Sequence, residues 1–211
     1  MKMRIALLSL LTIVCLVVAI APAMADNLIY SNGAINGNVV GYTINFGFSV
    51  TDSFTVGGNG FSVETLSIGA WLIPGDHFDS VDMLFGSAPF GNDAGQRLDV
   101  AATSFIDLGL NSFGYDIQQI NFTFPNLKLL PGTYWLTLQN AVESNFGDPL
   151  YWDQNSGPSQ AQDSALGVIP SESFTLNGTP LGGTTPEPSS IMLFGSGVLG
   201  LAGVLRRKLN R

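Results

Sequence analysis

Hydrophobic and polar residues alternate through the middle of this chain. Across residues 42–50, an apolar or aromatic side chain occupies every second position, as in a strand with one buried face. Comparable apolar runs predict further strands over residues 63–73, 80–85, 115–124, 133–139 and 169–178. Clusters rich in glycine, proline and asparagine separate the runs, and no stretch between them has the periodicity of an amphipathic helix. Many short strands broken by such turns predict an all-β fold, a jelly-roll-like β-sandwich.

The first 25 residues have the pattern of a secretory signal peptide. Lys2 and Arg4 precede a long apolar stretch, and residues 23–25 read Ala-Met-Ala, a small-residue site for signal peptidase. We expect cleavage after Ala25. Cys15 is the one cysteine of the chain and leaves with this segment, so the exported domain is expected to fold without disulfides.

A second apolar segment lies near the C-terminus. Residues 189–205 carry no charge over 17 positions, and as a helix they would be about 25 Å long, close to the thickness of a bilayer core. The basic residues Arg206, Arg207 and Lys208 follow and are expected to stay in the cytoplasm. The pattern predicts a single C-terminal transmembrane helix; the alternative is a buried helix of a soluble domain.

Just before this segment stands the tripeptide Pro186, Glu187 and Pro188. The two prolines keep it extended and out of any helix. Taken with the apolar helix and the basic tail, residues 184–211 resemble the PEP-CTERM sorting signal of Gram-negative bacteria. The resemblance implies recognition and processing by the membrane enzyme exosortase, and an association with exopolysaccharide and biofilm production. We therefore expect export across the inner membrane to the cell envelope or the extracellular matrix.

Residues 26–183, between the two segments, are long enough for one domain with a substantial core. Their only basic residues are Arg97 and Lys128 against 15 acidic ones, a net charge of −13. Such a domain has no basic face for phosphates, so a nucleic-acid partner is excluded.

Catalytic signatures are missing from the predicted domain. His77 is its single histidine, and no Gly-x-Ser-x-Gly motif presents a serine nucleophile. One histidine without cysteine is also a poor basis for a zinc site. We therefore expect a non-enzymatic protein.

Acidic residues near His77 offer a candidate Ca²⁺ site. Asp76, Asp79 and Asp82 recur at every third position, and clustered carboxylate oxygens are the ligands that calcium prefers. The alternative is a solvated acidic turn whose carboxylates bond nearby backbone N–H groups. A weaker second candidate consists of Asp148, Asp153 and Asp163, near Asn155.

Aromatic residues suggest a second kind of site. Tyr151 and Trp152, together with Tyr134 and Trp135, could stack against sugar rings; the alternative is that they belong to the core. The leading expectation is a structural or adhesive role linked to exopolysaccharide. A carbohydrate-binding module is the alternative, to be distinguished by aromatic side chains exposed on one face. A glycoside hydrolase is the third hypothesis and requires two carboxylates facing each other across a cleft.

Overall fold

The computed structural model describes residues 27–182, and this part of the chain is all-β, as predicted. It contains thirteen strands and no helix, hence none with the length and apolar character that a membrane crossing requires. The expected signal peptide, sorting motif, transmembrane helix and basic tail lie outside the described residues. The strands are β1 (Asn27–Ser31), β2 (Gly41–Thr43), β3 (Ser49–Val56), β4 (Phe61–Leu72), β5 (Phe78–Gly86), β6 (Gly95–Ala101), β7 (Ser104–Leu110), β8 (Asp116–Leu129), β9 (Gly132–Glu143), β10 (Tyr151–Asp153), β11 (Ala161–Asp163), β12 (Gly167–Ile169) and β13 (Phe174–Pro180).

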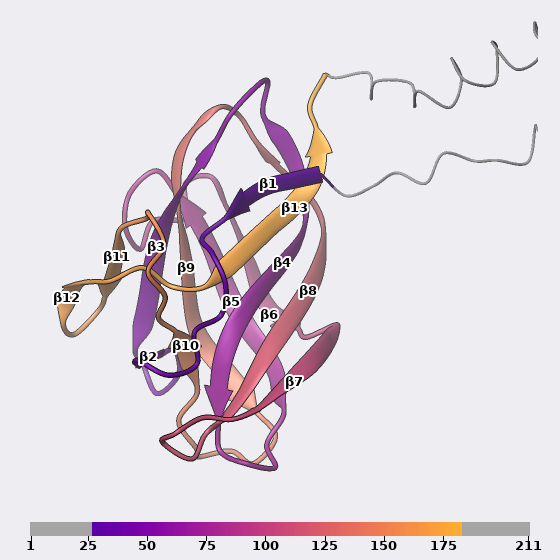
Figure 1. The fold of residues 1–211 in the computed structure, drawn as a ribbon. Coiled ribbons are helices and arrows are strands. Elements are labelled where there is room, and N and C mark those ends of the chain that lie inside the picture. The colour runs from indigo at the N-terminus through magenta and orange to yellow at the C-terminus, as the bar shows by residue number, and fades with distance from the viewer. Residues whose placement is uncertain (1–26, 183–211) are drawn as a thin grey trace, which may run out of the picture. The chain divides into compact units, whose positions relative to one another are not determined.

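Two antiparallel sheets contain all of these strands (Figure 1). In sheet A the long strand β4 pairs along its whole length with β8, which pairs in turn with β7. The opposite edge of β4 is shared by β13 and β10, which continue to β1 and β2 respectively. Sheet B has the order β12-β11-β3-β9-β5-β6. The chain crosses between the sheets several times, for example from β3 to β4 and from β4 to β5.

The hydrophobic core lies between the two sheets. Phe54 on β3 packs edge-on against Phe174 on β13 with ring centroids 6.1 Å apart, and Phe78 on β5 packs against Phe122 on β8 at 5.5 Å. Each pair joins one sheet to the other, as in a sandwich packed face to face. The predicted β-sandwich is therefore confirmed, whereas its jelly-roll-like topology stays a prediction.

The first predicted strand, over residues 42–50, is wrong as a continuous element. The chain instead leaves sheet A after β2 and enters sheet B at β3, with a turn between them. Phe46 has a φ of +55° and Gly47 a φ of +84° at this corner, and Phe46 is 57% exposed. The alternating pattern continues through the corner by coincidence. The prediction was wrong because a period of two does not reveal a change of sheet.

Candidate functional site

The outer face of sheet A carries a row of side chains along β4. Leu66, Ile68 and Ala70 point into the core, so the intervening positions point outward. These are Ser67, Gly69 and Trp71. Ser67 pairs with Asn121 on β8, and Gly69 pairs with Gln119 on the same strand. This alternation is not evident from the sequence, because residues 70–73 are uniformly apolar.

A segment without regular structure, residues 32–40, covers part of this face. One carboxylate on β10 fixes it: Asp153 Oδ2 accepts a 2.7 Å hydrogen bond from the Asn36 N–H, and its Oδ1 accepts one of 2.7 Å from Gly37. Asn155 Nδ2 also donates to the carbonyl of Asn32 at 2.6 Å. Burial raises the pKa of Asp153, while its N–H donors act in the opposite direction. Asp153 thus holds the middle of the segment, at Asn36 and Gly37.

Beside this segment lies a groove of about 270 Å³, which we call the aromatic groove. The Trp71 ring forms its base and stacks against Phe113, with centroids 5.9 Å apart and planes at 21°. Trp71 Nε1 donates a 2.7 Å hydrogen bond to Asp153 Oδ1, which fixes the orientation of the indole. Phe113 is 58% exposed. The groove is lined by Val39, Val40, Gly41, Trp71, Phe113, Tyr115 and Tyr151.

Two tyrosines form one wall of the aromatic groove. The rings of Tyr115 and Tyr151 meet edge to face at 5.4 Å, and their hydroxyl oxygens are 3.4 Å apart. Burial, together with the hydrogen bond between the Tyr151 and Tyr115 hydroxyls, raises the pKa of Tyr151 to about 12. Both hydroxyls can donate and accept, so the wall offers polar contacts without charge.

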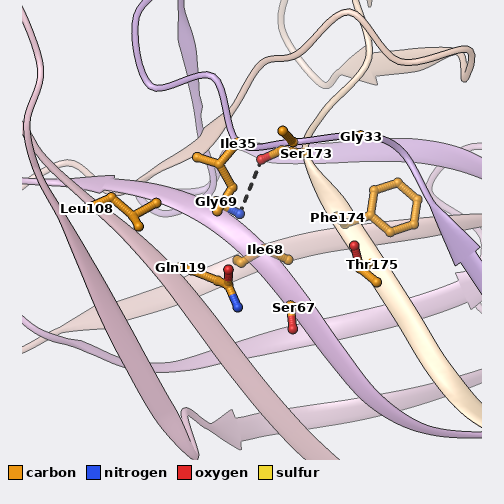
Figure 2. A pocket seen from close by; sticks show the side chains of 11 residues that line it. Gly33, Ile35, Ser67, Ile68, Gly69, Leu108, Gln119, Ser173, Phe174 and Thr175 are labelled. Atoms are coloured by element: carbon orange, nitrogen blue, oxygen red, sulfur yellow. Dashed lines mark hydrogen bonds between the residues drawn. The ribbon is translucent and has the colours of Figure 1, made fainter. Parts of the chain in front are cut away.

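A second hollow of about 330 Å³ lies further along the same face, and we call it the polar pocket (Figure 2). Ile35 from the covering segment and Leu108 from β7 contribute its apolar walls. The Gly69 N–H donates to Ser173 Oγ at 3.2 Å within it. The lining residues are Gly33, Ala34, Ile35, Ser67, Ile68, Gly69, Leu108, Gln119, Ser173, Phe174 and Thr175.

Neutral polar groups continue from this pocket across the strands. Ser67 Oγ donates to Asn121 Oδ1 at 2.7 Å, and Gln119 Nε2 donates to the same oxygen at 3.1 Å. Asn121 Nδ2 in turn donates to Ser104 Oγ at 3.2 Å on β7. Hydroxyl and amide groups next to exposed aromatic rings can hydrogen-bond and stack against a neutral, hydroxyl-rich ligand.

Of the two predicted glycan-contacting residues, only Tyr151 reaches this face. The expectation for Trp152 is corrected: its side chain is 0% exposed, packs against Phe174, and donates from Nε1 to the carbonyl of Ser173 at 2.8 Å. Neighbouring residues of a strand point to opposite faces, so only one of the pair can be outside. The sequence reasoning missed Trp71 and Phe113.

The structure does not bring the three aspartates of the first candidate Ca²⁺ site together. Asp76 is buried in the turn before β5 and bonds to Asn145, whereas the Asp79 side chain is exposed. Asp82 accepts hydrogen bonds from the Asp99 N–H and from Asn140 Nδ2. Across residues 27–182, no group of three or more histidine, cysteine or acidic side chains is arranged to hold a metal ion.

The second candidate set is also separated: Asp148 lies beside Asp76, and Asp153 and Asp163 belong to different sheets. Asp153 lies on the outer side of sheet A, bonded as described above. Asp163 Oδ1 accepts from the N–H groups of Ala165 and Leu166, at 2.7 and 2.9 Å, and so closes the β11–β12 hairpin. Each of these two aspartates thus has a local structural role.

Comparison with known proteins identifies the C-terminal end. A search of curated proteins found no match. The family model of the PEP-CTERM protein-sorting motif matches residues 184–208. The match includes Pro186, Glu187 and Pro188 and extends to the basic residues Arg206, Arg207 and Lys208. The chain thus carries a PEP-CTERM sorting motif, which implies export, processing by exosortase and sorting to the envelope or extracellular side of the cell.

Proposed function

We propose that the sandwich is a non-catalytic carbohydrate-binding module, delivered to the envelope or matrix of a Gram-negative bacterium to bind exopolysaccharide there. Its role would be adhesive or structural within a biofilm. The ligand would run over the outer face of sheet A, from the aromatic groove to the polar pocket. The observation that carries the proposal is the exposed Phe113 ring stacked on Trp71.

Exposed aromatic surface of this kind favours a binding role. Phe113 and its neighbours Val39 and Val40 form a contiguous apolar patch around the groove, and such patches on secreted domains commonly mark ligand sites. The C–H faces of pyranose rings pack against aromatic rings and bury apolar area from both partners. Tyr115 and Tyr151 would supply hydrogen bonds to the sugar hydroxyls at the rim.

The polarity of the site favours a neutral polysaccharide. The polar groups that line the polar pocket are hydroxyls, an amide and backbone, and no ionisable side chain lines it. The domain itself has a net charge of −13, so a polyanionic glycan would be repelled at low salt. A neutral chain of hexoses fits both the pocket and the charge.

A hydrolytic role has less support. Hydrolysis of a glycoside needs two carboxylates on an open cleft, one to protonate the leaving oxygen and one to act on the anomeric carbon. One adjoining acidic pair of this fold, Asp52 and Glu172, is 0% exposed and out of reach of a polymer. Neither the aromatic groove nor the polar pocket is lined by a carboxylate.

A glycan array tests the proposal. The exported full chain, kept in detergent, would be probed together with Phe113→Ala and with Phe90→Ala, a matched control on the β5–β6 hairpin of sheet B. We expect wild type and Phe90→Ala to bind the same neutral oligosaccharides and Phe113→Ala to bind them weakly. Absence of binding, or equal binding by all three proteins, would overturn the proposal.

A further inference from the structure

Two buried acidic residues, Asp52 and Glu172, adjoin inside the sandwich. Asp52 lies on β3 between Val50 and Phe54, which both point into the core, and it pairs with the inward Ala161 on β11. Because Asp52 Oδ2 accepts a 2.6 Å hydrogen bond from the Glu172 N–H, the two residues adjoin across the interior. Both are 0% exposed.

The side chain of Glu172 also points inward. It stands two positions before Phe174, whose ring is in the core, and residues two apart in an extended chain share a face. The isolated bridge between Glu172 and Gln154 places it in line with sheet A, opposite Asp52 on sheet B. The two residues thus meet from the two layers, with both side chains buried.

Three oxygens of this pair have no hydrogen-bond partner: Asp52 Oδ1, Glu172 Oε1 and Glu172 Oε2. An unsatisfied buried carboxylate is among the least favourable groups a protein can contain. The charged groups that act most strongly on Glu172 are Asp52, Asp153 and Asp163, all acidic. These described neighbours therefore add negative charge around Glu172.

The geometry points to a Ca²⁺ ion bound between Asp52 and Glu172. Its ligands would be Asp52 Oδ1 and both oxygens of Glu172, with neutral oxygens completing the shell. Ser159 Oγ is one such oxygen beside the pair: Asn32 Nδ2 donates to it at 2.6 Å and to Asp52 Oδ2 at 3.0 Å. Calcium accepts such mixed sets of hard oxygens, including bidentate carboxylates, whereas zinc would require nitrogen or sulfur ligands.

The ion would be a structural link between the layers. It would join β3 of sheet B to the residue that leads into β13 of sheet A, in a domain without cysteine between residues 27 and 182. Asn32 also begins the segment 32–40 that lines the polar pocket and the aromatic groove. Bound calcium would therefore stabilise the domain and hold its binding face in place.

The test uses the full chain in detergent at pH 7.5, after EGTA treatment and dialysis. Adding CaCl₂ alone should raise the Tm by about 5–10 °C at a hundredfold excess over Kd, and calorimetric titration should give one site per chain. Glu172→Gln and Asp52→Asn should fold but lose the response, because each removes ligand charge while keeping side-chain shape. The control Asp79→Asn, an exposed aspartate elsewhere, should respond as wild type does.

Wild-type protein alone suffices to overturn the inference. If EGTA and CaCl₂ leave its Tm unchanged and titration shows no heat of binding, the two carboxyls share a proton and hold no metal. A calcium response lost in Asp79→Asn but retained in Glu172→Gln would also overturn it, since the ion would then bind at the β5 aspartates.

Discussion

Trp71 Nε1 donates a 2.7 Å hydrogen bond to Asp153 Oδ1, and the same carboxylate accepts the backbone N–H groups of Asn36 and Gly37. One side chain thus links the base of the aromatic groove to the middle of the segment that borders it. Because Asp153 lies on β10 beside β4, the sheet itself determines where the groove forms.

Asp153→Asn should weaken both stability and ligand binding. An amide has one acceptor oxygen in place of two, so at least one buried N–H donor would lose its partner, at a cost of about 1–3 kcal/mol. Urea denaturation should show a lower midpoint with an unchanged slope. Asp79→Asn serves as the exposed control and should match wild type. Equal midpoints for Asp153→Asn and wild type would contradict the anchoring role.

Gly41→Ala should distort the aromatic groove. A Cβ at this position would lie 2.7 Å from Tyr151 Cβ and 3.2 Å from the Trp71 ring, so Tyr151 and Trp71 would have to move away from it. Overpacking of this kind costs about 1–3 kcal/mol, and near-ultraviolet circular dichroism should report the changed aromatic environment. Gly57→Ala, where a Cβ meets nothing within 4 Å, is the control. A wild-type spectrum for Gly41→Ala would show that the groove tolerates the methyl group.

Metal-free protein should become less stable as pH rises from about 4 toward neutrality. Burial raises the pKa of Asp52 to about 6 from its ordinary 3.8, and burial followed by Asp52 raises that of Glu172. At a pH between the unfolded and folded pKa values, the folded state retains a proton that the unfolded state has released. The free energy of unfolding is therefore larger at low pH and decreases as the pH rises through this window. Asp153 shifts in the same direction.

Thermal melts in EGTA at pH 5 and pH 7.5 measure this effect. Wild type should have the higher Tm at pH 5, and Glu172→Gln should show a smaller difference because one buried charge is gone. A Tm that rises from pH 5 to pH 7.5 in metal-free wild type would mean that other groups of the chain already compensate the charges of Asp52 and Glu172.

Apolar and alternating runs predicted several of the strands that bury side chains in the core. The predicted run over residues 63–73 corresponds to β4, and that over 133–139 falls within β9. Strands β6 and β7 were not predicted, because their side chains are mostly exposed and carry no one-sided pattern. Around Phe46, by contrast, the alternating pattern predicted a strand where the chain turns from one sheet to the other.

The site depended on information that the sequence does not contain. Whether Tyr151 or Trp152 faces outward follows from the pairing of β10 with β4, which no local pattern reveals. Asp52 and Glu172 are far apart in the chain and meet only in the folded sandwich. One signal was present: Asp52 occupies an apolar-face position between Val50 and Phe54.

Replacing Pro186, Glu187 and Pro188 by alanine should leave export and folding intact but block processing. The tripeptide lies within the matched sorting motif, outside the sandwich that folds on its own core. Immunoblots of membrane and medium should show the unprocessed chain accumulating in the membrane. Deletion of residues 189–211 should instead release soluble domain. Normal maturation of the alanine variant, in a host with its cognate exosortase, would reduce the segment to a plain membrane anchor.

Binding of a neutral exopolysaccharide by the outer face of sheet A is tested most directly by calorimetry. The host's purified exopolysaccharide would be titrated into wild type, Phe113→Ala and Phe90→Ala. Truncation of an aromatic anchor at a binding site typically costs more than about 1.4 kcal/mol, so Phe113→Ala should bind at least about tenfold more weakly. Phe90→Ala should retain wild-type affinity. Equal affinities for the three proteins, or no heat of binding to wild type, would contradict the account.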